Sequence, residues 1–236
     1  LLNGYGFEIV FKYWDILILL AFINLLSYLF LIRSLQIGPI SVIAPLTTLF
    51  SVVSLGLAYL FLDERLTFPQ IVVISVALIG AVITVFKPGK INLVSSNLGI
   101  GIVLGFFATL IIGAQFFVQG AISKEVGWFL GVYFPMMFSI FGFVPIAFYK
   151  REIPWQKINI KIMGLLFMTS SMKIGAFFLF SRGAELGSIG IVSVAHTTYP
   201  VIPIFAGVLL FKERLSCSQV LGIVLLLSSL AILSVV

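Results

Sequence analysis

The chain has 236 residues, of which 61% are hydrophobic and only 9% are charged, whereas about a quarter of the residues in a soluble domain are charged. This small number of charged side chains cannot cover a globular surface of this size. A water-soluble fold is therefore excluded, and the apolar surface must face lipid. The net charge of +6 comes from basic residues scattered singly or in short loops between apolar stretches, which indicates contact with anionic lipid and no nucleic-acid partner.

Apolar runs of about 20 residues, the length that a helix needs to cross the hydrocarbon core, predict eight transmembrane helices. The runs lack the alternating pattern of barrel strands, so we expect an all-α polytopic membrane protein. Short links between neighbouring spans leave no room for an extramembrane domain. In chain order the predicted spans are Tyr13–Leu35, Ile40–Leu62, Phe68–Phe86, Leu98–Ile122, Gly127–Tyr149, Ile160–Arg182, Ser188–Phe211 and Ser216–Val236.

The sequence contains an internal repeat. Aligning Glu64-Arg65-Leu66 with Glu213-Arg214-Leu215 gives an offset of 149 residues (213 − 64). Chance matches among Leu, Ile and Val are common in membrane proteins, but coincident charged, glycine and amide residues are not, so the repeat is meaningful. The same offset pairs Lys12 with Lys161, Arg33 with Arg182, Gly38 with Gly187, Thr48 with Thr197, and Gln70 with Gln219.

The second copy has two more spans ahead of it, Leu98–Ile122 and Gly127–Tyr149. A complete unit would therefore hold five helices, and an odd number inverts the second copy relative to the first, which is the architecture that supports alternating access. The chain begins without Met, a basic segment or a cleavage site, so we expect the first two helices to be missing. The predicted organisation is a truncated first repeat over residues 1–90 and a second repeat over residues 91–236.

Two pairs of stretches carry a family resemblance. They are Arg33 to Leu46 with Arg182 to Gly187, and Leu62-Asp-Glu-Arg-Leu66 with Phe211-Lys-Glu-Arg-Leu215. They resemble the EamA-type repeat of the drug/metabolite transporter superfamily, and the resemblance covers essentially the whole chain. It implies a ten-helix secondary transporter of two inverted five-helix halves, here with about eight helices, in the plasma membrane. It also implies the movement, frequently outward, of amino acids, sugars, nucleotide-linked sugars or other small metabolites. We expect a small-molecule substrate and leave a homodimer open.

Lys173 is a candidate binding residue in the middle of Ile160–Arg182, with Ser170 one turn before it. A charge at the centre of a membrane helix costs at least about 2.5 kcal/mol, so an ammonium there is a functional hypothesis: it would attract a carboxylate or phosphate on the substrate. The structural alternative is an ammonium satisfied by carbonyls at helix ends. The repeat equivalent of Lys173 is Asn24 (173 − 149), also in the middle of a span, with Tyr28 one turn further on.

His196 is the second candidate, at the head of a polar run that includes Tyr199. It could couple transport to protons or bind a ligand, or it could hydrogen-bond a neighbouring helix. Two prolines that follow it remove backbone donors, which predicts a kinked and polar midpoint of the kind that lines a cavity. Thr47 and Thr48 occupy the matching place in the first repeat.

Three further sequence features have structural interpretations: one glutamine, one glycine spacing and two Glu-Arg pairs. Gln115 is a weaker binding candidate, for which an interhelical hydrogen bond is the alternative. The Gly101-x-x-x-Gly105 spacing predicts close helix packing and no nucleotide loop, since no strand precedes it and no Lys-Ser/Thr follows it. The two Glu-Arg pairs at span ends, Glu64-Arg65 and Glu213-Arg214, predict solvated or capping ion pairs, and we interpret them as orientation and hinge elements.

The residues at membrane depth argue against an enzyme. The predicted span interiors contain no Asp or Glu and no nucleophile with a base, and the chain has one histidine and one cysteine, Cys217. We therefore expect no catalysis, no cofactor and no metal site. The competing interpretation is a non-transporting scaffold or receptor-like protein, which predicts tight apolar packing around Lys173 and His196 in place of a cavity.

Overall fold

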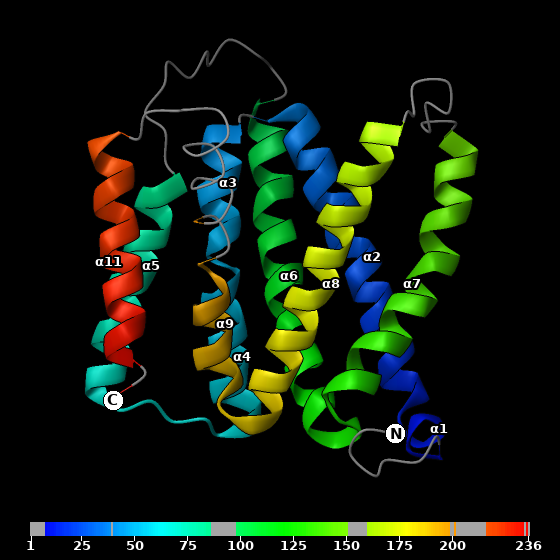
Figure 1. The fold of residues 1–236 in the computed structure, drawn as a ribbon, viewed down its shortest axis with the longest axis horizontal. Coiled ribbons are helices and arrows are strands. Elements are labelled where there is room, and N and C mark those ends of the chain that lie inside the picture. The colour runs from blue at the N-terminus through cyan, green and yellow to red at the C-terminus, as the bar shows by residue number, and fades with distance from the viewer. Residues whose placement is uncertain are drawn as a thin grey trace. The chain divides into compact units, whose positions relative to one another are not determined.

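The computed structural model of the protein describes residues 8–38, 40–85, 98–150, 160–198, 201, 216–233 and 235. Every regular element in these ranges is a helix (Figure 1), which confirms the all-α prediction. The chain forms two compact units. Unit 1 holds Leu1–Leu25 with Val118–Gly187, and unit 2 holds Leu26–Phe117 with Ser188–Val236.

The helices follow the predicted spans closely. Four described stretches are long and apolar enough to cross a membrane: Trp14–Ile37, Val42–Leu62, Gly99–Val126 and Trp128–Pro145. The helices are the short α1 (Glu8–Lys12), α2 (Trp14–Ile37), α3 (Ile40–Thr48), α4 (Phe50–Leu62), α5 (Phe68–Val85), α6 (Leu98–Val126), α7 (Trp128–Lys150), α8 (Ile160–Leu186), α9 (Ile189–His196) and α11 (Cys217–Leu233).

Some predicted spans differ from the observed helices. The single predicted span Ile40–Leu62 is two helices, α3 and α4, separated at Leu49. Helix α8 continues past the predicted end at Arg182 to Leu186. Within this last turn Arg182 donates to Glu185 at 2.8 Å, and a pair three residues apart stabilises the helical conformation. Of the predicted span Ser188–Phe211, the structure describes helix over α9 and at Val201, and Tyr199 lies outside the described residues.

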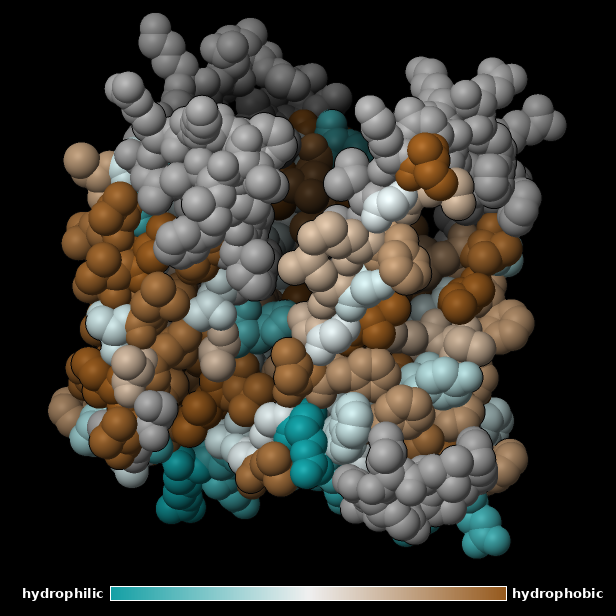
Figure 2. Space-filling view, in the orientation of Figure 1, coloured by the Kyte–Doolittle hydropathy of each residue, from teal (hydrophilic) through white to brown (hydrophobic). Residues whose placement is uncertain are grey.

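Large apolar side chains cover much of the described surface. Phe68 and Phe167 are 78% and 77% exposed, and Phe141 on α7 is 75% exposed. Hydrophobic residues accordingly dominate the face drawn in Figure 2. A surface of this kind is stable in lipid and not in water, so the protein is an integral membrane protein.

Unit 1 is held by an apolar core between its N-terminal helices, the end of α6 and the start of α7. The core residues are Val10, Leu17, Leu20, Ile122, Val126 and Leu130. Beside this core, buried Gln119 on α6 donates to the Gly131 carbonyl at 2.8 Å and to the Ser181 hydroxyl at 2.9 Å. One amide therefore connects α6, α7 and α8 where water cannot reach.

Unit 2 is built around close contacts at glycines. Helices α5 and α11 lie side by side (Figure 1). A Cβ atom added at Gly80 would lie 2.8 Å from the Leu226 nitrogen, and one added at Gly222 would lie 2.5 Å from the Thr84 hydroxyl. Since any larger side chain would separate these backbones, the glycines set the distance between the two helices.

The predicted packing role of the Gly101-x-x-x-Gly105 spacing is confirmed. A Cβ atom at Gly101 would lie 2.5 Å from the Cα atom of Gly38 at the end of α2, and one at Gly105 would lie 2.9 Å from the Ser34 hydroxyl. That hydroxyl donates to the Gly101 carbonyl at 2.9 Å. Small residues on both helices allow this approach.

Hydrogen bonds at helix ends recur at the 149-residue offset. Arg33 donates to Gln36 at 3.4 Å, as Arg182 does to Glu185 at 2.8 Å. The first turns of α5 and α11 are capped alike. The Thr67 amide donates to the Gln70 side chain at 2.9 Å, and the Ser216 amide donates to the Gln219 side chain at 3.0 Å. The same sequence pattern thus produces the same local structure twice.

Candidate functional site

Unit 2 contains a helix interruption in the middle of a predicted span. Helix α3 ends at Thr48 and α4 begins at Phe50. Between them the Leu49 amide donates to the Leu46 carbonyl at 3.2 Å, and the Val52 amide donates to the Leu49 carbonyl at 3.0 Å. These bonds join residues three apart, where an α-helix joins residues four apart, so the backbone is locally tightened.

The same interruption occurs at the end of α9. The Thr198 amide donates to the Ala195 carbonyl at 3.2 Å, and the Val201 amide donates to the Thr198 carbonyl at 2.9 Å. Each of these bonds is 149 residues from its counterpart around Leu49 (198 − 49). The interruption therefore belongs to the repeated pattern and lies beside the candidate residues of both copies.

Three of the threonines at the two interruptions are buried. Thr47 is 7% exposed, and Thr48 and Thr197 are fully buried. The Thr47 hydroxyl donates to the Ala44 carbonyl at 2.9 Å, and the Thr197 hydroxyl donates to the Val194 carbonyl at 2.6 Å. Each of these two hydroxyls satisfies a carbonyl of its own helix and keeps oxygen lone pairs to accept a further hydrogen bond.

His196 is the polar end of an aromatic cluster. Its ring centroid lies 4.8 Å from that of Phe116 and 6.1 Å from that of Phe50, and the two phenyl centroids are 4.7 Å apart. Both phenyl rings are at least 95% buried, whereas His196 is half-buried. Helices α4, α6 and α9 thus fix the position of the imidazole.

Sequence reasoning did not identify Phe50 or Phe116 as neighbours of His196. The chain contains 24 phenylalanines, so a phenylalanine in an apolar run carries no signal of its own. The weak signal available was the position of Phe50, two residues after Thr48 in the first repeat.

Gln115 forms an interhelical hydrogen bond, the structural alternative to ligand binding for this side chain. Its side-chain oxygen accepts from the Ser27 hydroxyl at 2.8 Å, and both residues are 2% exposed. This bond joins α2 to α6 within unit 2. Tyr28, next to Ser27, is half-buried in the same unit.

Lys173 belongs to unit 1 and is exposed on α8. Its ammonium nitrogen lies 6.0 Å from the ring centroid of Phe177, which is 6% exposed. Ser170, one turn earlier, is also exposed, and Asn24 on α2 is half-buried in the same unit. The candidate residues therefore divide between the units: Lys173, Ser170 and Asn24 lie in unit 1.

Glu64 has a defined structural partner. Its carboxylate accepts from the Ser188 hydroxyl at 2.7 Å and from the backbone amides of Ile189 and Gly190 at 3.0 and 3.2 Å. Glu64 therefore caps the start of α9, a partner that the sequence did not predict. Glu213, its counterpart, lies outside the described residues.

No group of three or more His, Cys, Asp or Glu side chains in the described ranges could hold a metal ion. Cys217 is exposed at the start of α11. The chemistry that the described candidate residues offer is thus binding through hydroxyl, amide, imidazole and ammonium groups.

Comparisons with known proteins place this fold. Eighteen chains of solved structures match. One, a crystal structure of a protein, has a TM-score of 0.78 at 12% identity and covers 98% of this chain and 78% of its own, a likeness of fold alone. The search of curated proteins found no match. The sequence model of the EamA-like transporter family matches residues 5–86 and 99–235. Since these residues make up most of the chain, the protein belongs to the EamA-like transporter family.

Proposed function

We propose that the protein is a secondary transporter, a permease or exporter that moves small metabolites such as amino acids or related compounds across the plasma membrane by alternating access. Members of its family are typically transporters and not enzymes. The observation that carries the proposal is the pair of helix interruptions at Leu49 and Thr198, equivalent in the two copies. Irregular backbone at membrane depth is tolerated where it is buried in protein or lines a wet cavity, and substrate sites of many transporters lie at such interruptions.

The proposed substrate contacts lie at these interruptions and at the polar centres of the predicted spans. His196 would hydrogen-bond a polar group of the substrate, held in place by the phenyl rings of Phe50 and Phe116. Lys173 favours a substrate with a carboxylate or phosphate, because an ammonium attracts such groups strongly at low dielectric. The other proposed contacts are Asn24, Tyr28, Thr47, Thr48, Gln115, Ser170 and Tyr199. The proposed repeats span residues 1–90 and 91–236.

Counterflow in liposomes tests the proposal. The wild-type protein and the Lys173→Ala and His196→Ala variants are reconstituted separately in liposomes. Counterflow is then measured for a mixed panel of acidic and neutral metabolites. We expect the wild-type protein to transport at least one member of the panel. The Lys173→Ala variant should lose the flux of acidic substrates, and the His196→Ala variant should show a reduced flux of every substrate. Folded wild-type protein that moves no panel member would favour the scaffold interpretation, and unimpaired flux in both variants would refute the proposed site.

A further inference from the structure

We infer that Glu64 is a positioning residue that joins α4 to α9, the helix carrying His196, an inference that rests on the function proposed above. The three hydrogen bonds to its carboxylate come from the first turn of α9 and the residue before it. Unpaired amides and the helix dipole favour a carboxylate at a helix N-terminus, and a charged acceptor strengthens each bond. Glu64 therefore connects the end of a helix from the proposed first repeat to the start of one from the second.

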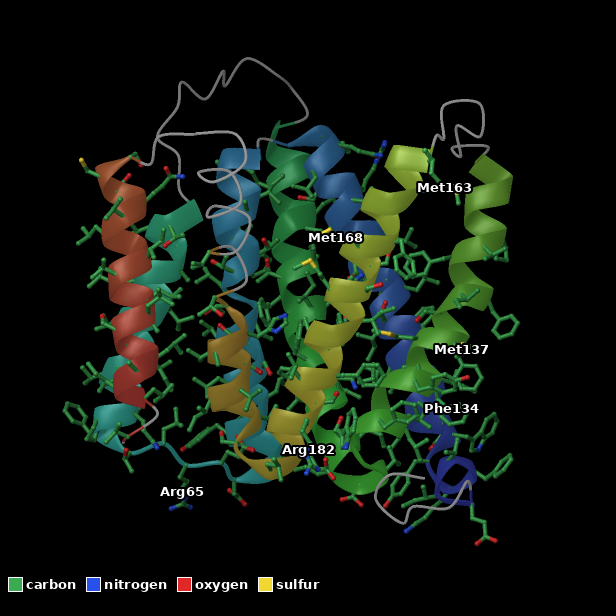
Figure 3. The ribbon with its side chains drawn as sticks, viewed as in Figure 1. Arg65, Phe134, Met137, Met163, Met168 and Arg182 are labelled. Atoms are coloured by element: carbon green, nitrogen blue, oxygen red, sulfur yellow. The ribbon has the colours of Figure 1, made fainter. Side chains whose placement is uncertain are left out.

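The three charged residues that follow α4, Asp63-Glu64-Arg65, form a link whose conformation directs Glu64 alone toward α9. Asp63 ends α4 in a left-handed conformation with φ of 50°, which turns the chain sharply, and its side chain is exposed. Arg65 is also exposed, and its side chain extends away from the helices (Figure 3). Of the three charged residues in this link, only Glu64 is half-buried.

The same two helices are connected again along their length. The hydroxyls of Ser54 on α4 and Ser193 on α9 lie 2.8 Å apart, and both residues are fully buried. A Cβ atom added at Gly190 would overlap the side chain of Leu55, so the helices approach closely there. Contacts at the start, first turn and middle of α9 thus hold it to α4 as one rigid pair.

A rigid pair confines bending to its ends, where the helices are interrupted at Leu49 and Thr198. His196 lies seven residues beyond Ile189, about 10 Å along the helix axis, so Glu64 acts on the proposed site only through α9. Loss of the carboxylate would remove the connection at the start of α9 and let that end of the helix move relative to α4. Such a change slows the conformational step and leaves substrate affinity nearly unchanged.

The first test compares Glu64→Gln with Asp63→Asn, a control that removes the same charge one residue away and tolerates the left-handed conformation. We expect the maximal counterflow rate to fall about tenfold in Glu64→Gln, as loss of one charge-assisted hydrogen bond predicts, with KM within about twofold of wild type. Asp63→Asn should keep both constants. A wild-type rate in Glu64→Gln would overturn the inference.

The second test restores the link covalently. The substitutions Ser54→Cys and Ser193→Cys, in protein whose single cysteine is removed by Cys217→Ser, place two thiols close enough to form a disulfide, since the native hydroxyl oxygens are 2.8 Å apart. Oxidation should leave transport intact when Glu64 is present and should restore it in Glu64→Gln. Transport that stops on oxidation with Glu64 present, or is not restored in Glu64→Gln, would contradict a rigid α4–α9 pair.

A third readout needs no substrate. In the same cysteine pair, we expect Glu64→Gln to slow disulfide formation several-fold relative to Asp63→Asn, because α9 separates from α4 more often. If no variant transports any substrate, the function proposal fails while this rate still tests the link. Equal rates in the two variants would then overturn the role of Glu64.

Discussion

At the residue scale, most buried hydroxyls are used by the helix that carries them. Thr84 donates to the Gly80 carbonyl at 2.8 Å, and Ser123 donates to the Gln119 carbonyl at 2.7 Å. Such bonds satisfy the hydroxyl in lipid without joining helices. The bond between Ser54 and Ser193 is different because it crosses from one helix to another.

Two serines on α4 provide a matched comparison. Ser51 and Ser54 are both fully buried, but the Ser51 hydroxyl has no hydrogen-bond partner among the described residues. We expect Ser54→Ala to lower the free energy of unfolding by about 0.6–1.7 kcal/mol, the range measured for interhelical hydrogen bonds in a membrane protein, and Ser51→Ala to leave it unchanged or higher. Unfolding in mixed micelles measures both. Equal destabilisation would show that Ser51 is also paired.

Sequence alone could identify the residues that are chemically rare at membrane depth. Lys173 and His196 stand out because ionisable groups there are costly. The partners of such residues could not be identified, since Phe50 and Phe116 resemble every other apolar residue in their spans. The choice between ligand and helix contact for Gln115 likewise depended on Ser27, 88 residues away.

At the element scale, span ends were predictable and the interruptions were predictable only in part. Pro45 precedes the interruption at Leu49 by one turn, and a proline removes a backbone donor. Its counterpart is Val194 (45 + 149), which carries no such signal, yet the helix ends two residues later. The signal in the second copy is Pro200 instead, because it has no amide hydrogen to donate to the His196 carbonyl four residues earlier, so local sequence also favours the end of α9 at His196.

Two glycines near the start of α6 provide an element-scale prediction. A Cβ atom at Gly101 would lie 2.5 Å from the Cα atom of Gly38, whereas nothing lies within 4 Å of one at Gly99. We expect Gly101→Ala to cost about 1–3 kcal/mol through overpacking of α2 against α6, and Gly99→Ala to cost nothing. Thermal unfolding in detergent checks both. Equal melting temperatures for the two variants would contradict the packing role of Gly101.

At the scale of the whole molecule, the compact units do not coincide with the predicted repeats. Unit 1 combines Leu1–Leu25 with Val118–Gly187, so it takes helices from both proposed repeats, and the division falls within α2 and α6. Sequence periodicity records which segments share an ancestral pattern, whereas contacts decide which segments pack. Helices α4 and α9 come from different copies and pack together through side chains that the alignment does not pair, such as Ser54 and Ser193.

Accessibility of the α9 interruption tests the central claim, that this backbone lines an alternately opened pathway. Ala195 is exposed beside His196, and Cys217→Ser removes the only native cysteine. In Ala195→Cys protein in sealed vesicles of each orientation, a membrane-impermeant maleimide should label the new cysteine from both sides, and a transported substrate should slow the labelling. A cysteine that resists the reagent from both sides in folded protein would place the interruption in lipid or sealed packing and contradict the account.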